Sequence, residues 1–335
     1  MAQKKPTVTL KDIAQQTGYS INTVSRALRD KADIADATRQ KIKKVAAEMG
    51  HVNNMLAASL RLGYTNTVAV ILGDISNPHF AIMMKEIEVH AREYGYNSIL
   101  YNTNEDEELE LEAIRSALNK NVDGIIICPA QKTQENLKYL ESTGVPFVLI
   151  GRRDEAYSYV VCNDEMGGFL ATAALISAGH RDILLLHGAM YISSARERLA
   201  GYRRAYAQSG LEVPEGLIRE VPVTANGCSA VLEQLKEEGM TFSAIFAFSD
   251  MLAWEAWSCL MRREIRVPQD CSLIGFDHIQ SRLNLPFSLT SVSSYKGRMS
   301  TTAVDLLVRR MQGSSEKEQL VIDTALAVGQ TVMTL

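Results

Sequence analysis

The sequence predicts an α/β protein in which a small helical head precedes two similar α/β halves built on parallel sheets. Two observations support this prediction. Residues 1–64 hold eleven Lys and Arg against five Asp and Glu, whereas the remaining residues carry a net charge of −10. Beyond residue 64, apolar runs of strand length alternate with helical patterns, which is typical of a parallel sheet covered by helices on both faces.

The composition is that of a globular protein, with 335 residues of which 46% are hydrophobic and 22% charged. No apolar run approaches the roughly 20 residues of a membrane span. The first residues, "MAQKKPTVTLKD", lack the apolar segment of a signal peptide. We therefore expect a cytoplasmic protein with no membrane partner. The five cysteines lack the paired short spacing of disulfide or zinc motifs, so we expect buried thiols.

The head is predicted to contain three short helices, at about 10–17, 21–29 and 37–49, because apolar residues recur there at helical spacing. Gly18 permits a sharp turn after the first helix. Ser20 is a good N-cap for the second. This pair of helices predicts a helix-turn-helix motif.

The second helix is apolar on one face and carries polar side chains without a carboxylate on the other: Asn22, Ser25, Arg26 and Arg29. Such a helix fits the major groove of double-stranded DNA. Arg suits guanine and Asn suits adenine, while Ser and Thr hydroxyls can bind phosphate. Together with the basic charge, this motif predicts that the head binds DNA.

The two halves are predicted from regularly alternating segments. The expected strands are 67–73, 97–102, 124–129, 146–151, 182–188, 218–223, 244–249 and 272–277. The expected helices are 77–95, 107–120, 133–143, 166–178, 194–209, 227–238 and 251–263.

Catalytic motifs are missing from the sequence: it has no G-x-G-x-x-G after a strand, no P-loop, no H-E-x-x-H and no G-x-S-x-G. Its six histidines are scattered, so we expect no metal site, no cofactor and no catalytic residue. An enzyme would need a constellation that the sequence does not contain.

A ligand site is predicted between the two halves, because ligands of open parallel sheets bind beyond the carboxyl ends of the strands. Polar groups and aromatic rings follow these ends, and they suit a polyhydroxylated ligand. Each of them could instead cap a helix or pair internally. The candidates include Ile75, His79, Phe80, Cys128, Arg152, Asn163, Ser249, Asp250 and Asp277.

The chain resembles the LacI/GalR family of bacterial transcription repressors over essentially its whole length. The motifs that carry the resemblance are the segment from "TLKDIAQQTGYSINTVSRALRD" to "NNMLAASLR", then "DISNPHF", "NVDGIII", "NDEMGG", "SAGHRDI", "RERLAGYRRA", "VPQDCSLIGFDH" and "LTSV". The resemblance implies a helix-turn-helix head (1–50), a hinge (51–63) and a two-lobed, periplasmic-binding-protein-like core (64–335). The core subdomains would be about 64–161 with 291–320 crossing, and about 162–290.

The resemblance also implies roles for residues in the head and hinge. Ile21, Asn22 and Arg26 would contact bases, with Thr23 and Ser25 near phosphate, and Ser20 and Arg29 are also expected among the DNA-binding residues. In the hinge, Asn54, Ala57 and Leu60 would enter the minor groove, Leu60 as an apolar wedge. A segment this short would fold only on DNA. The departures from the family pattern are His51, Asn53 and Ala58, the last two of which should weaken the hinge.

In the cleft, Arg198 and Asp277 match family positions that hold ligand, with Phe80 and Ile75 or His79 as the apolar wall. Departures occur at Asn163, Ser249 and Pro222. A sugar is the first expectation for the effector, and Arg152 leaves open an acidic or phosphorylated ligand.

These features predict a DNA-binding transcriptional regulator, expected to be a repressor, that meets a pseudo-palindromic operator as a homodimer under control of a small effector. A dimer is expected because no leucine heptad follows the last strand. Whether the effector releases or tightens DNA binding stays open. An extracytoplasmic sugar receptor would explain the core but neither the basic head nor the missing export signal.

Overall fold

The computed structural model describes residues 8–51, 64–221, 227–282 and 287–335. It divides into two compact units, 1–65 and 66–335, which are treated separately below. The boundaries of head, hinge and core subdomains stay predictions. The candidate hinge residues and Pro222 lie outside the described residues: Asn53, Asn54, Ala57, Ala58 and Leu60.

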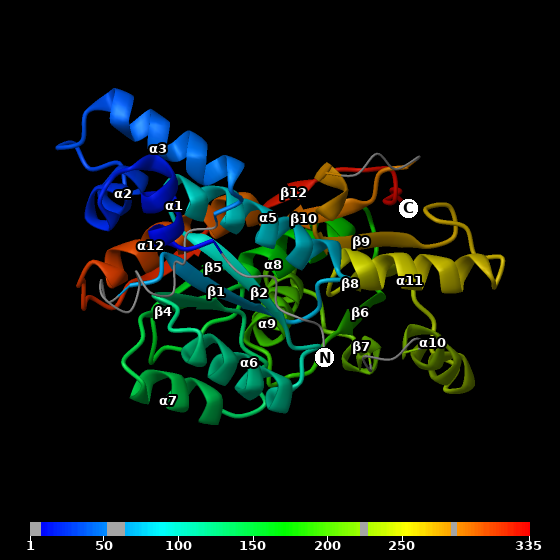
Figure 1. Ribbon diagram of the computed structural model, residues 1–335. Coiled ribbons are helices and arrows are strands. Elements are labelled where there is room, and N and C mark those ends of the chain that lie inside the picture. Colours follow the sequence, from blue (N-terminus) through cyan, green and yellow to red (C-terminus); the bar gives the residue numbers. More distant parts are fainter. Residues whose placement is uncertain (1–7, 52–63, 222–226, 283–286) are drawn as a thin grey trace, which may run out of the picture. The chain divides into compact units, whose positions relative to one another are not determined.

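Unit 1 contains the three predicted helices (Figure 1), namely α1 (Leu10–Thr17), α2 (Ile21–Leu28) and α3 (Asp36–Glu48). Thr9 and Asp12 form a capping box at the start of α1. Gly18 ends α1 with a φ of 77°, a left-handed conformation that glycine adopts at little cost. The predicted cap is confirmed, because the Ser20 hydroxyl accepts from the Thr23 amide at 3.1 Å. The three helices share one core, made of Ile13, Ala14, Val24, Ala27, Ile42 and Ala46.

Within the described part of unit 2, the first sheet has the strand order β11-β5-β4-β3-β1-β2, and all neighbouring strands are parallel. Its strands are β1 (Thr67–Leu72), β2 (Asn97–Asn102), β3 (Gly124–Ile127), β4 (Phe147–Ile150), β5 (Tyr159–Cys162) and β11 (Gln319–Ile322). Alternate side chains pack on α5 (Pro78–Glu93) and α12 (Lys296–Met311) on one face, and on α6 (Glu107–Asn119) and α7 (Glu135–Ser142) on the other.

The second sheet has the order β12-β10-β9-β8-β6-β7. Its strands are β6 (Ile183–His187), β7 (Ile218–Glu220), β8 (Ala244–Ala247), β9 (Ser272–Asp277), β10 (Thr290–Ser293) and β12 (Ala325–Ala327). One face packs on α8 (Asp164–Ser177) and α9 (Ser193–Gln208), and the other on α10 (Gly227–Glu237) and α11 (Asp250–Met261). Two short 3-10 helices, η1 (Glu215–Leu217) and η2 (Ile279–Arg282), complete the described elements.

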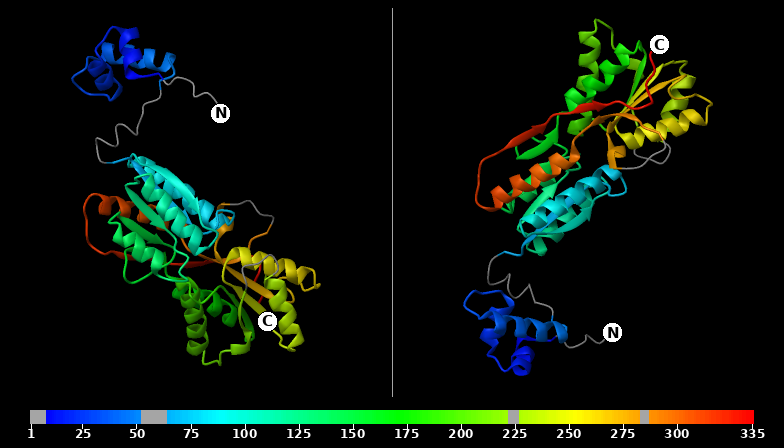
Figure 2. Two further views of the ribbon diagram at one scale, coloured as in Figure 1. Left: turned by 60° about the horizontal axis from the view of Figure 1, so that its bottom comes forward. Right: turned by 90° about the horizontal axis from the view of Figure 1, so that it is seen from above.

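The chain passes between the two sheets three times, after β5, after β10 and after β11. Figure 2 shows the C-terminal segment, in red, running from one half of unit 2 to the other. The strands β5, β10, β11 and β12 and the helix α12 are not among the segments predicted from the sequence. The strand β5 follows β4 without an intervening helix, and the edge strand β12 pairs with β10 in the antiparallel direction.

The interior of unit 2 confirms two further expectations. All five cysteines are buried free thiols. His180 of "AGHRD" is buried, with its ring nitrogens 2.9 Å from the hydroxyls of Ser243 and Ser272, so it has a structural place. Among the described residues, no helix is long and apolar enough to span a membrane.

Candidate functional site

The polar face of α2 is the candidate nucleic-acid surface of unit 1. Val24 and Ala27 point into the core, so the side chains between them face outward. Ile21 is 50% exposed, which is unusual for a large apolar side chain. Among the other predicted contact residues, the exposed ones are Asn22, Arg26 and Arg29. The partly buried ones are Thr23 and Ser25.

Internal partners already hold part of this surface. The Arg26 guanidinium binds Asp33 through Nη2 at 2.6 Å and Nε at 2.9 Å. The hydrogen bond and the charge of Asp33 raise the pKa of Arg26. The Thr23 hydroxyl lies 2.8 Å from that of Ser20. Asp33 thus occupies part of the guanidinium in the free protein, whereas Nη1 takes no part in these two contacts.

Arg198 on α9 is the centre of the candidate site in unit 2. Its Nε donates to Asp164 Oδ1 at 2.8 Å, and a second guanidinium nitrogen donates to the Phe248 carbonyl. The guanidinium carbon lies 3.5 Å from the centre of the Phe276 ring and 4.4 Å from that of Phe248. Both charged groups are buried. This packing orients the guanidinium rigidly, as recognition of a polar ligand requires.

The two halves of unit 2 meet beside Arg198. His79, at the start of α5 in the first half, has Nδ1 3.4 Å from Oδ1 of Asp277, at the end of β9 in the second half. The same carboxylate oxygen is 3.9 Å from Arg198 Nη2. Burial lowers the pKa of His79, although the charge of Asp277 opposes this, so the imidazole is neutral near pH 7. Three polar groups from both halves thus converge; Arg198 and Asp277 were expected in a ligand site, whereas His79 was expected in its apolar wall.

The end of β9 is held in a strained conformation that presents Asp277. Asp277 and His278 have φ values of 97° and 50°, which are uncommon for residues other than glycine. Buried Lys296 donates to the carbonyls of both residues, at 2.6 Å and 3.1 Å. Such strain persists only when surrounding contacts fix it, and it concentrates at functional sites.

The carboxylate of Asp250 also stabilises the turn that contains Asp277 and His278. Its two carboxylate oxygens accept from the Ser291 hydroxyl at 2.5 Å and from the Ile279 amide at 2.7 Å. Burial, together with the charge of Asp277, raises the pKa of Asp250 to about 7. Asp250 is fully buried, so its oxygens are used within the protein.

The other sequence-predicted cleft residues have internal partners as well. Asn163 and Ser249 cap α8 and α11 by accepting from the amides of Met166 and Leu252. Arg152 is buried and binds Glu105 and the Pro129 carbonyl. Phe80 and Cys128 pack in the core of the first half, and burial raises the pKa of Cys128 to about 12. Ile75 is partly buried, and its amide donates to Asn102. A ligand contact by any of these residues stays a prediction.

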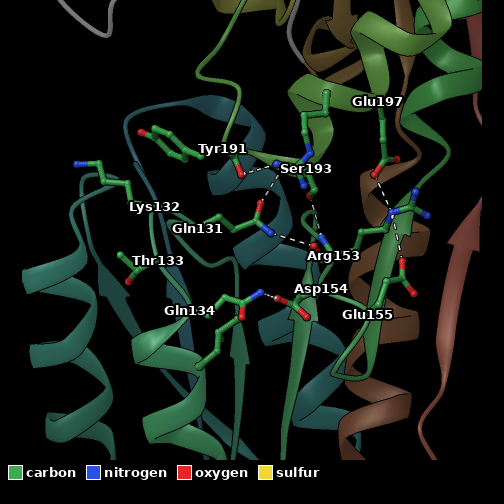
Figure 3. A pocket seen from close by; sticks show the side chains of 12 residues that line it. Gln131, Lys132, Thr133, Gln134, Arg153, Asp154, Glu155, Tyr191, Ser193 and Glu197 are labelled. Atoms are coloured by element: carbon green, nitrogen blue, oxygen red, sulfur yellow. Dashed lines mark hydrogen bonds and ion pairs between the residues drawn. The ribbon is translucent and has the colours of Figure 1, made fainter.

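A pocket of about 670 Å³ opens where loops of both halves face each other (Figure 3). Its lining includes Gln131 and Arg153 from the first half and Tyr191, Ser193 and Glu197 from the second. The sequence prediction missed these residues and Lys296. Gln131 and Arg153 could have been suspected, since each lies a few residues beyond a strand end. Lys296 also lies just beyond a strand, but that strand, β10, was not among the predicted ones. Among the described residues, no group of His, Cys, Asp and Glu could hold a metal ion.

This architecture, a helix-turn-helix unit and a core of two doubly covered sheets with a polar cleft, defines a class of ligand-responsive regulators. Residues 9–54 match the model of bacterial regulatory proteins of the lacI family. Residues 65–322 match the model of periplasmic binding proteins and the sugar binding domain of the LacI family. The chain belongs to the LacI family.

Individual relatives span nearly the whole chain. The HTH-type transcriptional repressor PurR of Vibrio parahaemolyticus serotype O3:K6 (strain RIMD 2210633) is 30% identical over 315 residues, covering 93% of this chain and 94% of that protein. The transcriptional regulator CelR in complex with cellobiose is 28% identical, with a TM-score of 0.72 over 98% of this chain and all of that one. The lac repressor dimer bound to operator and the anti-inducer ONPF has a TM-score of 0.87 at 24% identity and covers the same shares, which shows a common fold.

Proposed function

We propose that the chain is a transcriptional repressor that binds a pseudo-palindromic operator as a homodimer, with an affinity set by a carbohydrate bound between the halves of the core. One observation carries the proposal: a ligand cleft where His79 of one half meets Asp277 and Arg198 of the other belongs to the same chain as an exposed recognition helix. The solved relatives bind operator in one case and cellobiose in another.

The proposed DNA contacts follow from the exposed face of α2. Asn22 and Arg26 contact base edges in the major groove, Ile21 contacts an apolar edge such as a thymine methyl, and Thr23, Ser25 and Arg29 lie toward the phosphates. Ser20 starts the helix there. We further propose minor-groove contacts for Asn54, Ala57 and Leu60, as the family resemblance implies.

The proposed effector contacts are the groups that converge between the halves. Arg198 donates to ligand hydroxyls, Asp277 accepts from them, and His79 and Phe276 bound the site. Arg152 is engaged by Glu105, which favours a neutral polyhydroxylated ligand over a phosphorylated one. Asn163, Ser249 and Asp250 then act by shaping the site.

Exposed apolar side chains support a dimer. On α11, Met251 is 40% and Met261 67% exposed, and in the first half Val89 is 45% and Leu100 36% exposed. Contiguous apolar surface is typical of subunit interfaces, and we propose that these side chains lie in the dimer contact. We propose that the chain works in the cytoplasm, where a DNA-binding repressor meets its operator. We propose no catalytic role for it, because its curated relatives are repressors.

Selection of bound duplexes from a random DNA pool tests this function. The whole chain is used at fixed salt, with and without a panel of pentoses, hexoses and disaccharides, because ionic strength dominates DNA affinity. The control is the full-length Asn22→Ala/Arg26→Ala variant. We expect the unaltered chain alone to enrich a pseudo-palindrome. No enrichment under any condition would contradict the proposal.

A further inference from the structure

Gln131, Arg153 and Ser193 form a closed ring of hydrogen bonds across the cleft (Figure 3). The Ser193 amide donates to Gln131 Oε1 at 2.9 Å, and the Arg153 amide donates to the Ser193 hydroxyl at 3.0 Å. Gln131 Nε2 closes the ring by donating to the Arg153 carbonyl at 2.9 Å. Gln131 and Arg153 belong to the first half and Ser193 to the second, so two of the three bonds join the halves.

An ion pair strengthens this bridge on one side. Arg153 Nε lies 2.7 Å from Glu197 Oε1 on α9 in the second half, and the Glu197 side chain is only 18% exposed. Partly buried pairs are screened less than pairs on the open surface. The four residues together define the interlobe bridge: Gln131, Arg153, Ser193 and Glu197.

The backbone at Gln131 is specialised for this contact. Its φ is 67°, in the left-handed region that costs a non-glycine residue of order 1–3 kcal/mol. The conformation directs both ends of the side-chain amide into the bridge, where each finds a partner. The adjacent pocket of about 670 Å³, with exposed Lys132, Thr133 and Tyr191 in its lining, gives the bridge room to open.

The bridge is continuous with the proposed effector site. Glu197 directly precedes Arg198 on the same helix, so a shift of α9 that moves one moves the other. We propose that the interlobe bridge is a latch that fixes how the two halves sit against each other, and that its release changes operator affinity. This inference rests on the proposed function for its second part.

The charges around Glu197 make the latch sensitive to pH. Burial raises the pKa of Glu197 to about 7, the charge of Asp164 on α8 adds to this, and Arg153 and Arg198 oppose it. Glu155 of the first half also faces Arg153, at 3.8 Å. Protonation as pH falls through about 7 removes the ion pair. Because the Arg153 side chain is 35% exposed and still has Glu155 at 3.8 Å, Glu197→Gln is expected to fold normally.

The test measures the distance between the halves in the full-length chain by electron spin resonance. Spin labels are attached at Glu112→Cys on α6 and Gln208→Cys on α9, both exposed positions, while the native thiols are buried. We expect the Gln131→Ala/Glu197→Gln variant to give a broader or shifted distance distribution at pH 8. We expect Glu197→Gln alone to abolish the difference between pH 8 and pH 6 that the wild type shows.

Matched controls separate the latch from general loosening. Glu215→Gln removes the surface pair with Arg203, and Gln134→Ala removes a bond to Asp154 within the first half. Unchanged distances in the latch variant, or equal changes in the controls, would overturn the proposal. On the selected duplex, the latch variant should change affinity at least about fivefold, and a change below twofold would show a merely structural contact. A failed duplex selection would contradict the proposed function, while the distances still test the latch.

Discussion

His90 on α5 contacts two carboxylates: that of Asp305, which links α5 to α12, and that of Glu93 on its own helix. Its ring nitrogens lie 2.8 Å from Glu93 and 2.7 Å from Asp305 on α12. Partial burial lowers the pKa of His90, but the hydrogen bonds and charges of Asp305 and Glu93 outweigh this and raise the pKa overall. The imidazolium therefore stabilises the fold below the unfolded pKa, of about 6.5, and this stabilisation is lost as pH rises through the folded pKa.

Replacing His90 tests this linkage. His90→Gln should lower the free energy of unfolding more at pH 6 than at pH 8, measured by urea denaturation. The difference between wild type and variant removes the contribution of other titrating groups. An equal loss at both pH values would show that His90 is neutral in the fold.

Lys296 supports the strained turn that presents Asp277. Lys296→Met would leave the Asp277 and His278 carbonyls without this donor, at a cost of about 1–3 kcal/mol. Urea denaturation of the full chain measures this cost. Lys236→Met, at an exposed lysine on α10, is the control and should unfold like the wild type. If Lys296→Met were as stable as the wild type, the turn at Asp277 and His278 would not depend on the Lys296 hydrogen bonds.

Asp33 pairs with Arg26 in the free protein, and we predict that it competes with DNA for this guanidinium. Asp33→Asn should therefore tighten operator binding, whereas Arg26→Ala should weaken it by about tenfold or more, because a bidentate contact to a base is lost. Binding is measured at one salt concentration by fluorescence anisotropy. Lys44→Ala, on the exposed side of α3, serves as a control. Weaker binding by Asp33→Asn would show that the pair orders Arg26 for the groove.

At the scale of elements, periodicity predicted the head helices and most strands, because their apolar residues face one core or two. It missed β5, whose four residues follow β4 without the helix that a parallel connection normally uses, and it also missed α12 and the strands β10, β11 and β12. It also could not give the antiparallel direction of β12, since strand direction depends on the crossings between sheets and leaves no local pattern.

The same limit applies to the site. Asp277 and Arg198 were predicted by resemblance and do lie together, but Asn163 and Ser249 could equally have been ligand groups. A polar residue after a parallel strand is where the following helix needs its N-cap, so sequence cannot separate the two roles. The two hydrogen bonds of the latch that join the halves connect residues 40 and 62 positions apart in the sequence, and only the fold brings them together.

Capping can be separated from ligand binding by substitution. Asn163→Asp keeps an acceptor for the Met166 amide and should keep stability, whereas Asn163→Ala should cost about 0.5–2 kcal/mol. Unfolding by urea gives these values. Calorimetry with the panel sugar that binds best gives the second readout. If Asn163→Asp stayed stable but lost sugar binding, Asn163 would be a ligand residue.

In the proposed mechanism, a conformational equilibrium of the whole molecule couples effector binding in unit 2 to DNA binding by unit 1. An effector can change operator affinity only by the difference between its affinities for the DNA-binding and the other arrangement of the chain. We propose that the groups that sense this difference are His79 in the first half and Asp277 and Arg198 in the second, because they come from opposite sides of one cleft.

The most direct test of this central claim is the ratio of operator dissociation constants with and without a saturating carbohydrate, for wild type and for Asp277→Asn. The variant keeps the shape of the side chain but removes its charge. We expect the carbohydrate to change the operator dissociation constant of the wild type by about 5- to 150-fold and that of the variant very little. The same ratio for both proteins would contradict the claim.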